Sequence, residues 1–272
     1  MSDCYAVVGN PVGHSLSPEI HAAFARQTGQ DIEYVKLLAP LDAFTAVVNK
    51  FRSDGGKGIN VTVPFKFDAF RMCEPAPSAV AAGAVNTLDF RGDKVEGFNT
   101  DGIGLIADLE RNLGFSLRDK RVLVMGAGGA TYGVVQPILD ACPQSLVIAN
   151  RTVHKATELV ARYTLSSKAT QVTAVGYPDL ATAQFDLIIN ATSAGLRDEM
   201  PPLPQAVFGP DALAYDMVYG RQTPFLTFAQ AHGARTADGL GMLVEQAAAA
   251  FKIWRGVEPQ TRPVITKLRA GR

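Results

Sequence analysis

The sequence predicts an α/β protein whose strands form two largely parallel sheets covered by helices. Short runs rich in Val and Ile alternate with segments of helical period along the whole chain of 272 residues. This alternation is typical of parallel strands joined by crossover helices. The runs form two series, one before residue 100 and one starting at Arg121. Because two series indicate two sheets, we expect two domains.

The first series has the order strand, helix, strand, helix, strand. Its predicted strands cover residues 5–9, 33–38 and 58–63, and its predicted helices cover residues 18–27 and 42–51. Residues 86–90 and 94–97 are expected to form a small hairpin, because Gly92 can adopt the positive φ that the turn requires. A further helix is expected from Asp101.

The second series contains five predicted strands and ends with a long helix. The strands cover residues 121–125, 145–150, 171–175, 185–190 and 212–219. The helix covers residues 239–255 and carries apolar side chains at helical spacing, so one of its faces should be buried. The pattern does not indicate which domain this face packs against.

Charge and cysteine content exclude several classes of protein. Lys and Arg total 26 and Asp and Glu total 26, so no diffuse positive field is available to hold a nucleic acid or an acidic membrane. No apolar run reaches the length of about 18 residues that a membrane span needs, and MSDCYAVVGN does not resemble a secretion signal. Cys4, Cys73 and Cys142 share no zinc-ligand spacing. We expect a soluble cytoplasmic protein with reduced thiols and no metal.

A glycine-rich turn follows the first strand of the second series, in RVLVMGAGGATYG. Bare backbone at Gly126, Gly128 and Gly129 lets the N–H groups of a helix N-terminus approach a pyrophosphate. The match to G-x-G-x-x-G is imperfect, since Thr131 takes the sixth position and Gly133 follows it. A tight structural turn is the alternative interpretation.

The end of the next strand favours NADP over NAD. Proteins that prefer NAD usually carry an acid there for the ribose hydroxyl, whereas this chain has Asn150, Arg151 and Thr152, with Lys155 close behind. A guanidinium can bind phosphate oxygens in a fork and an ammonium adds a point charge. Taken singly, either cation is more often a solvated surface residue, but their position at the predicted end of the strand favours the phosphate site.

Uncharged polar residues cluster at predicted strand ends in the first domain. Ser15 and Ser17 precede a helix and could meet a carboxylate, although Ser17 before Pro18 is also typical of a helix N-cap. Asn60 and Thr62 alternate with valines, which places two polar side chains on one face of a strand otherwise suited to burial.

Lys66 and Asp101 are the candidate catalytic pair. Reduction of a ketone by a nicotinamide places negative charge on the oxygen, which needs a proton donor within hydrogen-bond reach. Lys66 is that donor in our hypothesis, with the Asp101 carboxylate holding it. The four histidines are weaker candidates, and only His14 lies near the serine cluster.

Eight segments, taken in order, resemble the shikimate dehydrogenase family. They are GNPVGHSLSP, GINVTVPFK, AGAVNT, NTDG, GAGGA, NRT, NATSAG and DGLGMLVEQA. The resemblance covers nearly the whole chain. It implies reduction of 3-dehydroshikimate to shikimate with NADPH, in the pathway to chorismate and the aromatic amino acids.

The resemblance also implies how the two domains are composed. An N-terminal α/β substrate domain would comprise residues 1–101 and 239–272, because the C-terminal helix returns to it. A Rossmann-like doubly wound parallel sheet over residues 102–238 would bind NADP.

Matching the motifs residue by residue assigns the remaining roles. Ser15, Ser17 and Tyr219 would hold the substrate carboxylate, and the ring hydroxyls would be bound by Asn60, Thr62, Asn86 and Gln246. The pyrophosphate would lie on Gly126, Ala127, Gly128, Gly129 and Ala130. The adenosine phosphate would be surrounded by Asn150, Arg151, Thr152 and Lys155, and the nicotinamide end by Thr192, Met217 and Gly239.

Two other functions stay open at this point. A quinate/shikimate dehydrogenase of broader specificity would accept NAD, and an acid in place of Asn150 or Arg151 would have favoured it. A non-catalytic ligand sensor on the same fold would be free to lose Lys66 or Asp101, and this chain has both. A monomer and a homodimer are both consistent with the sequence.

Overall fold

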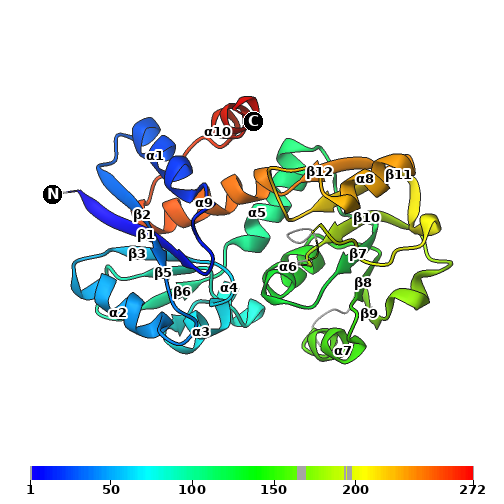
Figure 1. The fold of residues 1–272 in the computed structure, drawn as a ribbon, viewed down its shortest axis with the longest axis horizontal. Helices are drawn as coiled ribbons and strands as arrows, with labels where there is room; N and C mark the ends of the chain where they lie inside the picture. Colours follow the sequence, from blue (N-terminus) through cyan, green and yellow to red (C-terminus); the bar gives the residue numbers. More distant parts are fainter. Residues whose placement is uncertain (1, 164–169, 193, 195–197, 272) are drawn as a thin grey trace. The chain divides into compact units, whose positions relative to one another are not determined.

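The computed structural model describes residues 2–163, 170–192, 194 and 198–271, and the chain divides into two units. Unit 1 consists of residues 1–105 and 243–272, and unit 2 consists of residues 106–242. Each boundary lies four residues after the one expected from the motifs, at 105 instead of 101 and at 242 instead of 238. Unit 1 contains both ends of the chain (Figure 1).

Unit 1 is built on a six-stranded mixed sheet with the order β2-β1-β3-β5-β6-β4. Its strands are β1 (Asp3–Gly9), β2 (Ile32–Leu38), β3 (Gly58–Val61), β4 (Glu74–Pro75), β5 (Thr87–Asp89) and β6 (Glu96–Phe98). Strand β1 pairs in parallel with β2 and β3, whereas β5 is antiparallel to both β3 and β6. The antiparallel β5–β6 pair lies where the sequence predicts a hairpin.

Seven helices contribute residues to unit 1 within the described part of the chain, and the unit boundaries fall inside α5 and α9. They are α1 (Ser17–Thr28), α2 (Phe44–Ser53), α3 (Lys66–Arg71), α4 (Pro77–Ala82), α5 (Asp101–Ala107), α9 (Leu240–Arg255) and α10 (Arg262–Ala270). Helices α3 and α4 have only six residues each, too few to show a helical period, and the sequence analysis missed them.

The predicted strand over residues 58–63 is too long. Strand β3 ends at Val61, and Thr62 lies outside it, although its N–H still donates to the Val8 carbonyl at 2.9 Å. Pro64 has no N–H with which to continue a ladder, so the strand stops before it. The predicted end at residue 63 is therefore wrong, and a shared face for Asn60 and Thr62 stays a prediction.

The C-terminal helix α9 packs into unit 1 through Trp254. The Trp254 ring stacks on Tyr5 of β1, with ring centroids 4.7 Å apart, and its Nε1 donates to the Leu88 carbonyl at 3.0 Å. A Cβ on Gly58 would lie 2.4 Å from that nitrogen, so the bare glycine of β3 makes room for the indole. This contact answers which domain the buried face of the helix packs against.

Unit 2 is built on a six-stranded parallel sheet with the order β12-β11-β10-β7-β8-β9. Its strands are β7 (Arg121–Met125), β8 (Ser145–Ala149), β9 (Gln171–Val175), β10 (Phe185–Asn190), β11 (Phe208–Asp216) and β12 (Arg235–Asp238). Numbered within the unit, this is the order 3-2-1-4-5-6 of the doubly wound dinucleotide-binding fold. Strand order reverses between β7 and β10.

The other elements of unit 2 connect these strands. The helices are α6 (Gly129–Asp140), α7 (Val153–Ala161) and α8 (Pro224–Ala231), with a π-helical turn at Asp108–Asn112 and 3-10 turns at Tyr177–Leu180 and Gln205–Val207. The predicted strand over residues 212–219 is displaced, since β11 starts at Phe208 and ends at Asp216. The start of β11 was not predicted because it contains Gly209, Pro210 and Asp211, and these residue types usually interrupt strands.

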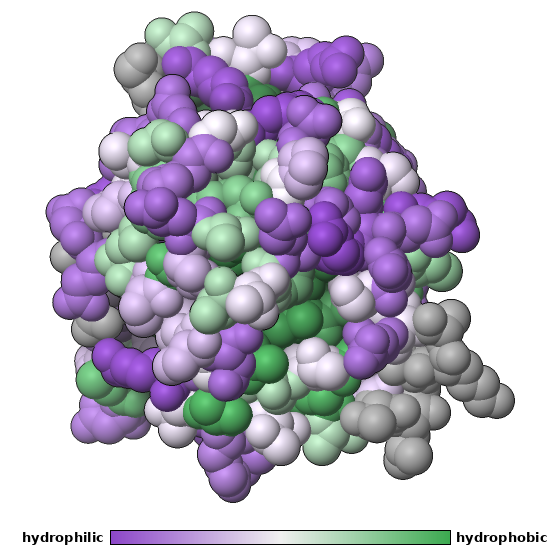
Figure 2. Space-filling model, turned by 90° about the vertical axis from the view of Figure 1, so that its right-hand side faces the viewer, coloured by the Kyte–Doolittle hydropathy of each residue, from purple (hydrophilic) through white to green (hydrophobic). Residues whose placement is uncertain are grey.

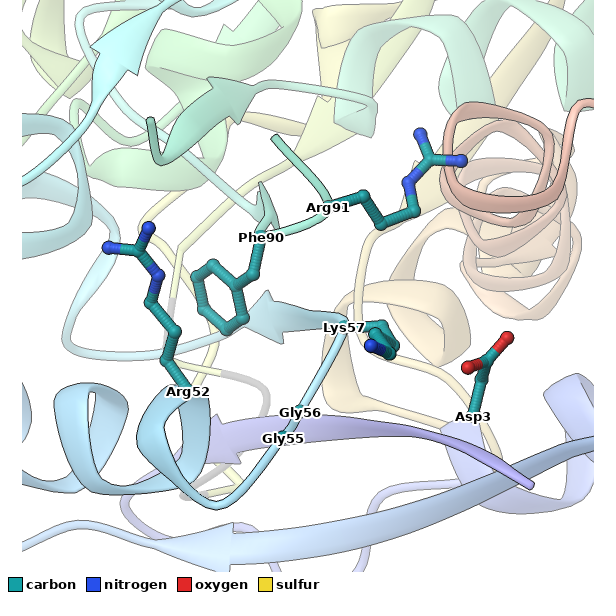
Figure 3. A pocket seen from close by; sticks show the side chains of 7 residues that line it. All are labelled: Asp3, Arg52, Gly55, Gly56, Lys57, Phe90 and Arg91. Atoms are coloured by element: carbon teal, nitrogen blue, oxygen red, sulfur yellow. The ribbon is translucent and has the colours of Figure 1, made fainter. Parts of the chain in front are cut away.

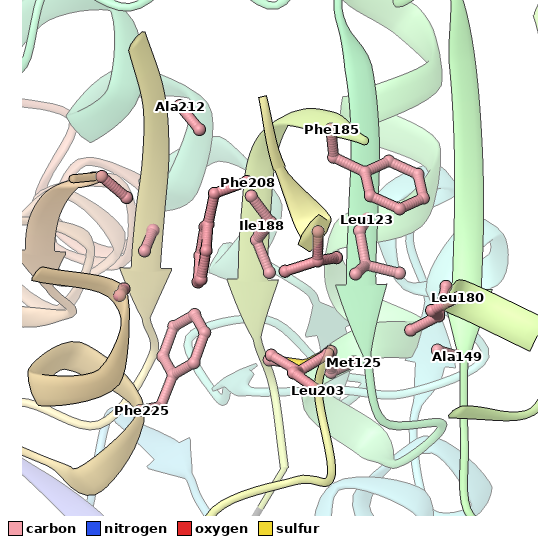
Figure 4. Packing of buried hydrophobic residues seen from close by; sticks show 14 of the residues in the cluster. Leu123, Met125, Ala149, Leu180, Phe185, Ile188, Leu203, Phe208, Ala212 and Phe225 are labelled. Atoms are coloured by element: carbon pink, nitrogen blue, oxygen red, sulfur yellow. The ribbon is translucent and has the colours of Figure 1, made fainter. Parts of the chain in front are cut away.

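The core of unit 2 lies between the sheet and its helices. Figure 4 shows Leu123, Met125 and Ile188 of the central strands packed with Phe185, Phe208 and Phe225. Figure 2 shows mainly hydrophilic residues, interrupted by a smaller hydrophobic area, on the face that it presents.

Among the described residues, no helix has the length and apolar character needed to cross a membrane.

Candidate active site

Lys66 and Asp101 lie side by side in unit 1. Lys66 is the first residue of α3 and Asp101 the first residue of α5, and the Lys66 Nζ lies 2.5 Å from Asp101 Oδ2. The two side chains are 14% and 9% exposed, so the ion pair is largely shielded but retains a path to solvent. A protonated amine held in this way can donate a proton to an oxygen placed beside it.

The side chain of Asn86 holds the other oxygen of Asp101. Its Nδ2 donates to Asp101 Oδ1 at 2.9 Å, while its Oδ1 accepts the backbone N–H of Thr100 at 2.9 Å. Because a backbone N–H can only donate, this contact fixes which end of the amide faces the carboxylate. The N–H of Asp101 itself donates to Asn99 Oδ1 at 3.1 Å. The orientation of the Asp101 carboxylate is thus set by several neighbours.

Gln246 of α9 joins the same cluster. Its Oε1 lies 3.4 Å from both Asn86 Nδ2 and Thr100 Oγ1, and its Nε2 donates to the Leu243 carbonyl at 2.8 Å. Local sequence alone favours an exposed Gln on an alanine-rich helix. Packing of α9 into unit 1 brings the amide to the catalytic pair instead.

The serine pair lies at the start of α1. Ser15 Oγ donates to Ser17 Oγ at 3.1 Å, and the Ser17 N–H donates to Ser15 Oγ at 3.3 Å. The structure assigns the N-cap position to Leu16 without a side-chain cap bond, so the capping role considered for Ser17 is wrong. The two hydroxyls lie together at the start of the helix, where Ser15 is half-buried and Ser17 is buried. His14 beside them is exposed.

Asn60 and Thr62 follow one another at the carboxyl end of β3. Asn60 is 6% exposed and its side-chain oxygen accepts from the Tyr34 hydroxyl at 2.7 Å. Its Nδ2 donates to Thr87 Oγ1 at 3.1 Å and to the Asn86 carbonyl at 3.3 Å. The Thr62 hydroxyl has no hydrogen-bond partner in the part of the chain that the structure describes.

The glycine turn of unit 2 lies between the end of β7 and the start of α6. Gly126 has φ of +105°, and a Cβ there would lie 3.1 Å from the Ala191 carbonyl oxygen. Gly128 is the N-cap of α6 and has open space where a side chain would project. Thr131, at the position where the motif has glycine, donates its hydroxyl to the Gly126 carbonyl at 3.0 Å and so supports the turn. The first-turn N–H groups of α6, beginning with Gly129 and Ala130, suit a pyrophosphate.

Polar residues at the end of β8 lie on the surface. Asn150 Nδ2 donates to the Thr152 carbonyl at 2.8 Å and closes the loop that leads into α7. The side chains of Arg151 and Lys155 are exposed, without an acidic partner among the described residues. Two exposed cations therefore stand at the place where the dinucleotide-binding fold holds a ribose.

The three residues predicted near the nicotinamide lie close to one another at the carboxyl ends of β10, β11 and β12. Thr192 donates to Asn190 Oδ1 at 2.7 Å, and the N–H of Met217 donates to the Asn190 carbonyl at 3.0 Å. A Cβ on Gly239 would lie 2.3 Å from the Met217 carbonyl oxygen, so only glycine fits there. Because Thr192 Cγ2 also lies beside Gly126, these residues and the glycine turn border one region at the point where strand order reverses.

Comparison with known proteins decides the family. Three family models match: "Shikimate dehydrogenase substrate binding domain" over residues 7–88, "Shikimate / quinate 5-dehydrogenase" over 108–197 and "Shikimate 5'-dehydrogenase C-terminal domain" over 239–269. A protein of Methylobacillus flagellatus named shikimate dehydrogenase (NADP(+)) is 57% identical over 270 residues, which are 98% of this chain and 99% of that protein. The chain belongs to the shikimate dehydrogenase family.

Solved structures agree with this membership of the shikimate dehydrogenase family. The Ael1 enzyme from Pseudomonas putida is 48% identical with a TM-score of 0.91, covering 98% of both chains. A shikimate 5-dehydrogenase from Thermus thermophilus, solved with NADP(H) and shikimate, is 32% identical with a TM-score of 0.86, covering 98% of this chain and 99% of that one.

Within this shikimate dehydrogenase family member, the predicted substrate and cofactor residues divide between the two units. The catalytic pair, the serines, Asn60, Thr62, Asn86 and Gln246 all belong to unit 1, and the predicted cofactor residues all belong to unit 2. Tyr219 also belongs to unit 2, so its contact with the substrate carboxylate stays a prediction.

Sequence reasoning assigned no role to four polar residues near Asn60 and Asn86: Tyr34, Thr87, Thr100 and His21. Thr87 and Thr100 are fully or almost fully buried, and both hydrogen-bond to Asn86. AVNT and NTDG did mark these threonines as parts of motifs. No local signal marks Tyr34, because a tyrosine in a predicted strand is ordinary.

An open pocket of about 320 Å³ lies elsewhere in unit 1 (Figure 3). It is lined by Asp3, Arg52, Gly55, Gly56, Lys57, Phe90 and Arg91, none of which belongs to the predicted site. Asp3 begins β1 and Lys57 precedes β3, so the pocket is at the amino ends of these strands, whereas Asn60 lies near the carboxyl end of β3 and Lys66 follows it. The pocket is therefore separate from the catalytic pair.

His21 of α1 is fully buried in unit 1, where its ring stacks on that of Tyr34. Neither ring nitrogen has a hydrogen-bond partner within the described residues, and burial lowers the pKa of His21 to about 3, with the Asn60 side chain opposing the shift. Its ring contacts are the aromatic side chains of Phe24, Tyr34, Phe251 and Trp254. The imidazole is consequently neutral at physiological pH.

This low pKa predicts an acid-dependent loss of stability that His21→Phe removes. Between about pH 6.5 and pH 3 the unfolded chain binds a proton at His21 that the folded chain does not, so stability falls as the pH drops through that window. At pH 5 the loss from this residue is about 2 kcal/mol. Urea unfolding at pH 7 and pH 5, followed by fluorescence of the single tryptophan Trp254, measures it in unit 1. An equal acid loss in wild type and variant would contradict the prediction.

Proposed function

We propose that the protein is an NADP-dependent shikimate dehydrogenase that catalyses the reversible reduction of 3-dehydroshikimate to shikimate. The observation that carries the proposal is the largely shielded Lys66–Asp101 pair at 2.5 Å, with Asn86 on the second carboxylate oxygen. A non-catalytic sensor has no need for such a pair. The relatives named shikimate dehydrogenase (NADP(+)) support the substrate and the cofactor. The pathway served is then that to chorismate and the aromatic amino acids.

The catalytic pair moves the proton of the reaction. In the reducing direction, the Lys66 ammonium donates a proton to the carbonyl oxygen of the substrate, and in the oxidising direction its amine takes that proton from the hydroxyl. Asp101 holds the Lys66 Nζ in place for this proton transfer. When NADPH is bound it supplies the hydride to the carbonyl carbon.

Unit 1 binds the substrate in this proposal. The hydroxyls of Ser15 and Ser17 hold the carboxylate, and Asn60, Thr62, Asn86 and Gln246 bind the ring hydroxyls. Support comes from the Thr62 hydroxyl, which is free within the described residues, and from the two serine hydroxyls, which lie together at the start of α1. A set of neutral hydrogen-bonding groups of this kind suits a small polyhydroxylated acid.

Unit 2 binds NADP in this proposal. Gly126 to Ala130 hold the pyrophosphate, and Asn150, Arg151, Thr152 and Lys155 surround the adenosine phosphate. Thr192, Met217 and Gly239 border the nicotinamide. The strand order, the open space at Gly128 and the two exposed cations after β8 support this placement.

A spectrophotometric assay of NAD(P)H formation tests the proposal directly. Shikimate and quinate are each offered with NADP⁺ and with NAD⁺. We expect oxidation of shikimate with NADP⁺ to have the highest kcat/KM. A preference for NAD⁺, or for quinate, would instead identify the broader quinate/shikimate enzyme, and no turnover in any combination would favour a sensor.

We also propose a cytoplasmic enzyme that acts without a nucleic-acid or membrane partner, as a monomer or a homodimer. Three free cysteines and the balanced charge support this setting. Light scattering of the purified chain distinguishes the two assembly states.

A further inference from the structure

Tyr34 of β2 lies between two groups of predicted substrate-binding residues. Its hydroxyl donates to Asn60 Oδ1 at 2.7 Å. Burial raises the pKa of Tyr34 well above its usual value, while a hydrogen bond with the Ser17 side chain lowers that pKa by less. One phenol therefore meets both Ser17 and the strand that carries Asn60, and it stays protonated.

The contacts of Asn60 fix the orientation of its amide. Its Nδ2 faces the backbone carbonyl of Asn86 at 3.3 Å and Thr87 Oγ1 at 3.1 Å. Since a carbonyl can only accept, the nitrogen must point there and the oxygen must point to Tyr34. A tyrosine hydroxyl that donates to the oxygen locks this orientation in place.

One hydrogen bond of the Asn60 amide can be exchanged at little cost. The Asn86 carbonyl already accepts the Val61 N–H at 2.8 Å, so it keeps a donor when a substrate oxygen replaces it as the acceptor of the Asn60 N–H, whose bond of 3.3 Å is long. The bond from Tyr34, at 2.7 Å, is much shorter. Asn60 is thus prepared to offer an N–H, while its oxygen stays engaged.

The ring of His21 packs face to face on the ring of Tyr34. The two rings stack with centroids 4.2 Å apart and planes 7° apart, and His21 is fully buried. Phe24, Phe251 and Trp254 enclose the imidazole in turn. A neutral, enclosed ring restricts the phenol without placing a charge beside the site.

We propose that Tyr34 is a positioning residue for substrate binding: its hydroxyl holds the Asn60 amide so that Nδ2, and not Oδ1, meets a ring hydroxyl oxygen of the substrate. The inference rests on the proposed function, which makes Asn60 a substrate contact. Tyr34 itself acts through Asn60 and performs no step of the chemistry.

Steady-state kinetics of Tyr34→Phe, Asn60→Ala and the double variant test this role. Tyr34→Phe should raise KM for shikimate about three- to tenfold, as loss of one hydrogen bond between neutral groups does, with kcat within about twofold and KM for NADP⁺ unchanged. In the Asn60→Ala background the same change should have no further effect on KM, because its target is gone. If Asn60→Ala does not fold, Asn60→Ser takes its place in the cycle.

Tyr5→Phe is the matched control. Tyr5 lies in the same unit and stacks on Trp254, but its hydroxyl contacts Arg255 and not Asn60. It should leave KM for shikimate unchanged, which separates positioning from a general loss of packing in unit 1.

Two outcomes would overturn the role of Tyr34. One is an unchanged KM for shikimate in Tyr34→Phe, and the other is the same rise in KM with and without the Asn60 side chain. Either result leaves the proposed function intact, provided that the wild type oxidises shikimate with NADP⁺. A wild type that does not do so refutes the proposed function itself.

Discussion

Replacement of Lys66 by alanine is expected to lower kcat for shikimate oxidation by about 100-fold or more, with a smaller change in KM. The reason is geometric: the Lys66 Nζ is held at 2.5 Å from Asp101 Oδ2, and in the proposed mechanism that amine accepts the proton of the substrate hydroxyl in this direction. Removing a general acid–base group affects the transition state more than the ground state. Initial rates over a range of shikimate concentrations, at saturating NADP⁺, separate the two constants.

Lys57→Ala is the control for the loss of a positive charge from unit 1. Lys57 precedes β3 and lines the separate pocket of Figure 3, whereas Lys66 follows the carboxyl end of that strand. We expect its kcat to match that of the wild type. An unchanged kcat in Lys66→Ala would remove this lysine from the mechanism, and an equal fall in both variants would point to a general effect of charge.

The strands of unit 2 could be predicted from the sequence because their apolar runs are short, bounded and nearly continuous. RVLVM and FDLIIN gave β7 and β10 with their observed bounds. Strand β12 was missed, since RTAD lacks such a run and its pairing with β11 is a tertiary contact. Pairing with a neighbouring strand, and not local preference, makes those four residues a strand.

The candidate site could be predicted only for residues whose side-chain chemistry alone suggests a catalytic or binding role. A lysine and an aspartate beside polar strand ends suggested proton transfer, but their 2.5 Å contact depends on α3 and α5 meeting in space. Tyr34 and His21 gave no comparable signal. Their roles follow from what they touch, which is set by how α1 and β2 pack together and cannot be inferred from a tyrosine or histidine alone.

Arg151→Ala should raise KM for NADP⁺ by about 10- to 100-fold while KM for NAD⁺ changes by less than about threefold. The guanidinium is exposed at the end of β8 and has no acidic partner among the described residues, so it is free to fork onto the oxygens of a 2′-phosphate. NAD⁺ lacks that group and therefore loses nothing. Kinetics with both cofactors at a fixed shikimate concentration measure the ratio of kcat/KM.

Ionic strength distinguishes a phosphate contact from a structural effect of the same substitution. An attraction between exposed charges weakens as salt rises, so the wild-type preference for NADP⁺ should shrink with added salt, whereas that of Arg151→Ala should change little. Arg118→Ala, an exposed arginine that precedes β7 at the opposite end of the sheet, should keep the wild-type preference at every salt concentration. Equal losses for both cofactors in Arg151→Ala would mean that the side chain supports the loop into α7 and does not select the phosphate.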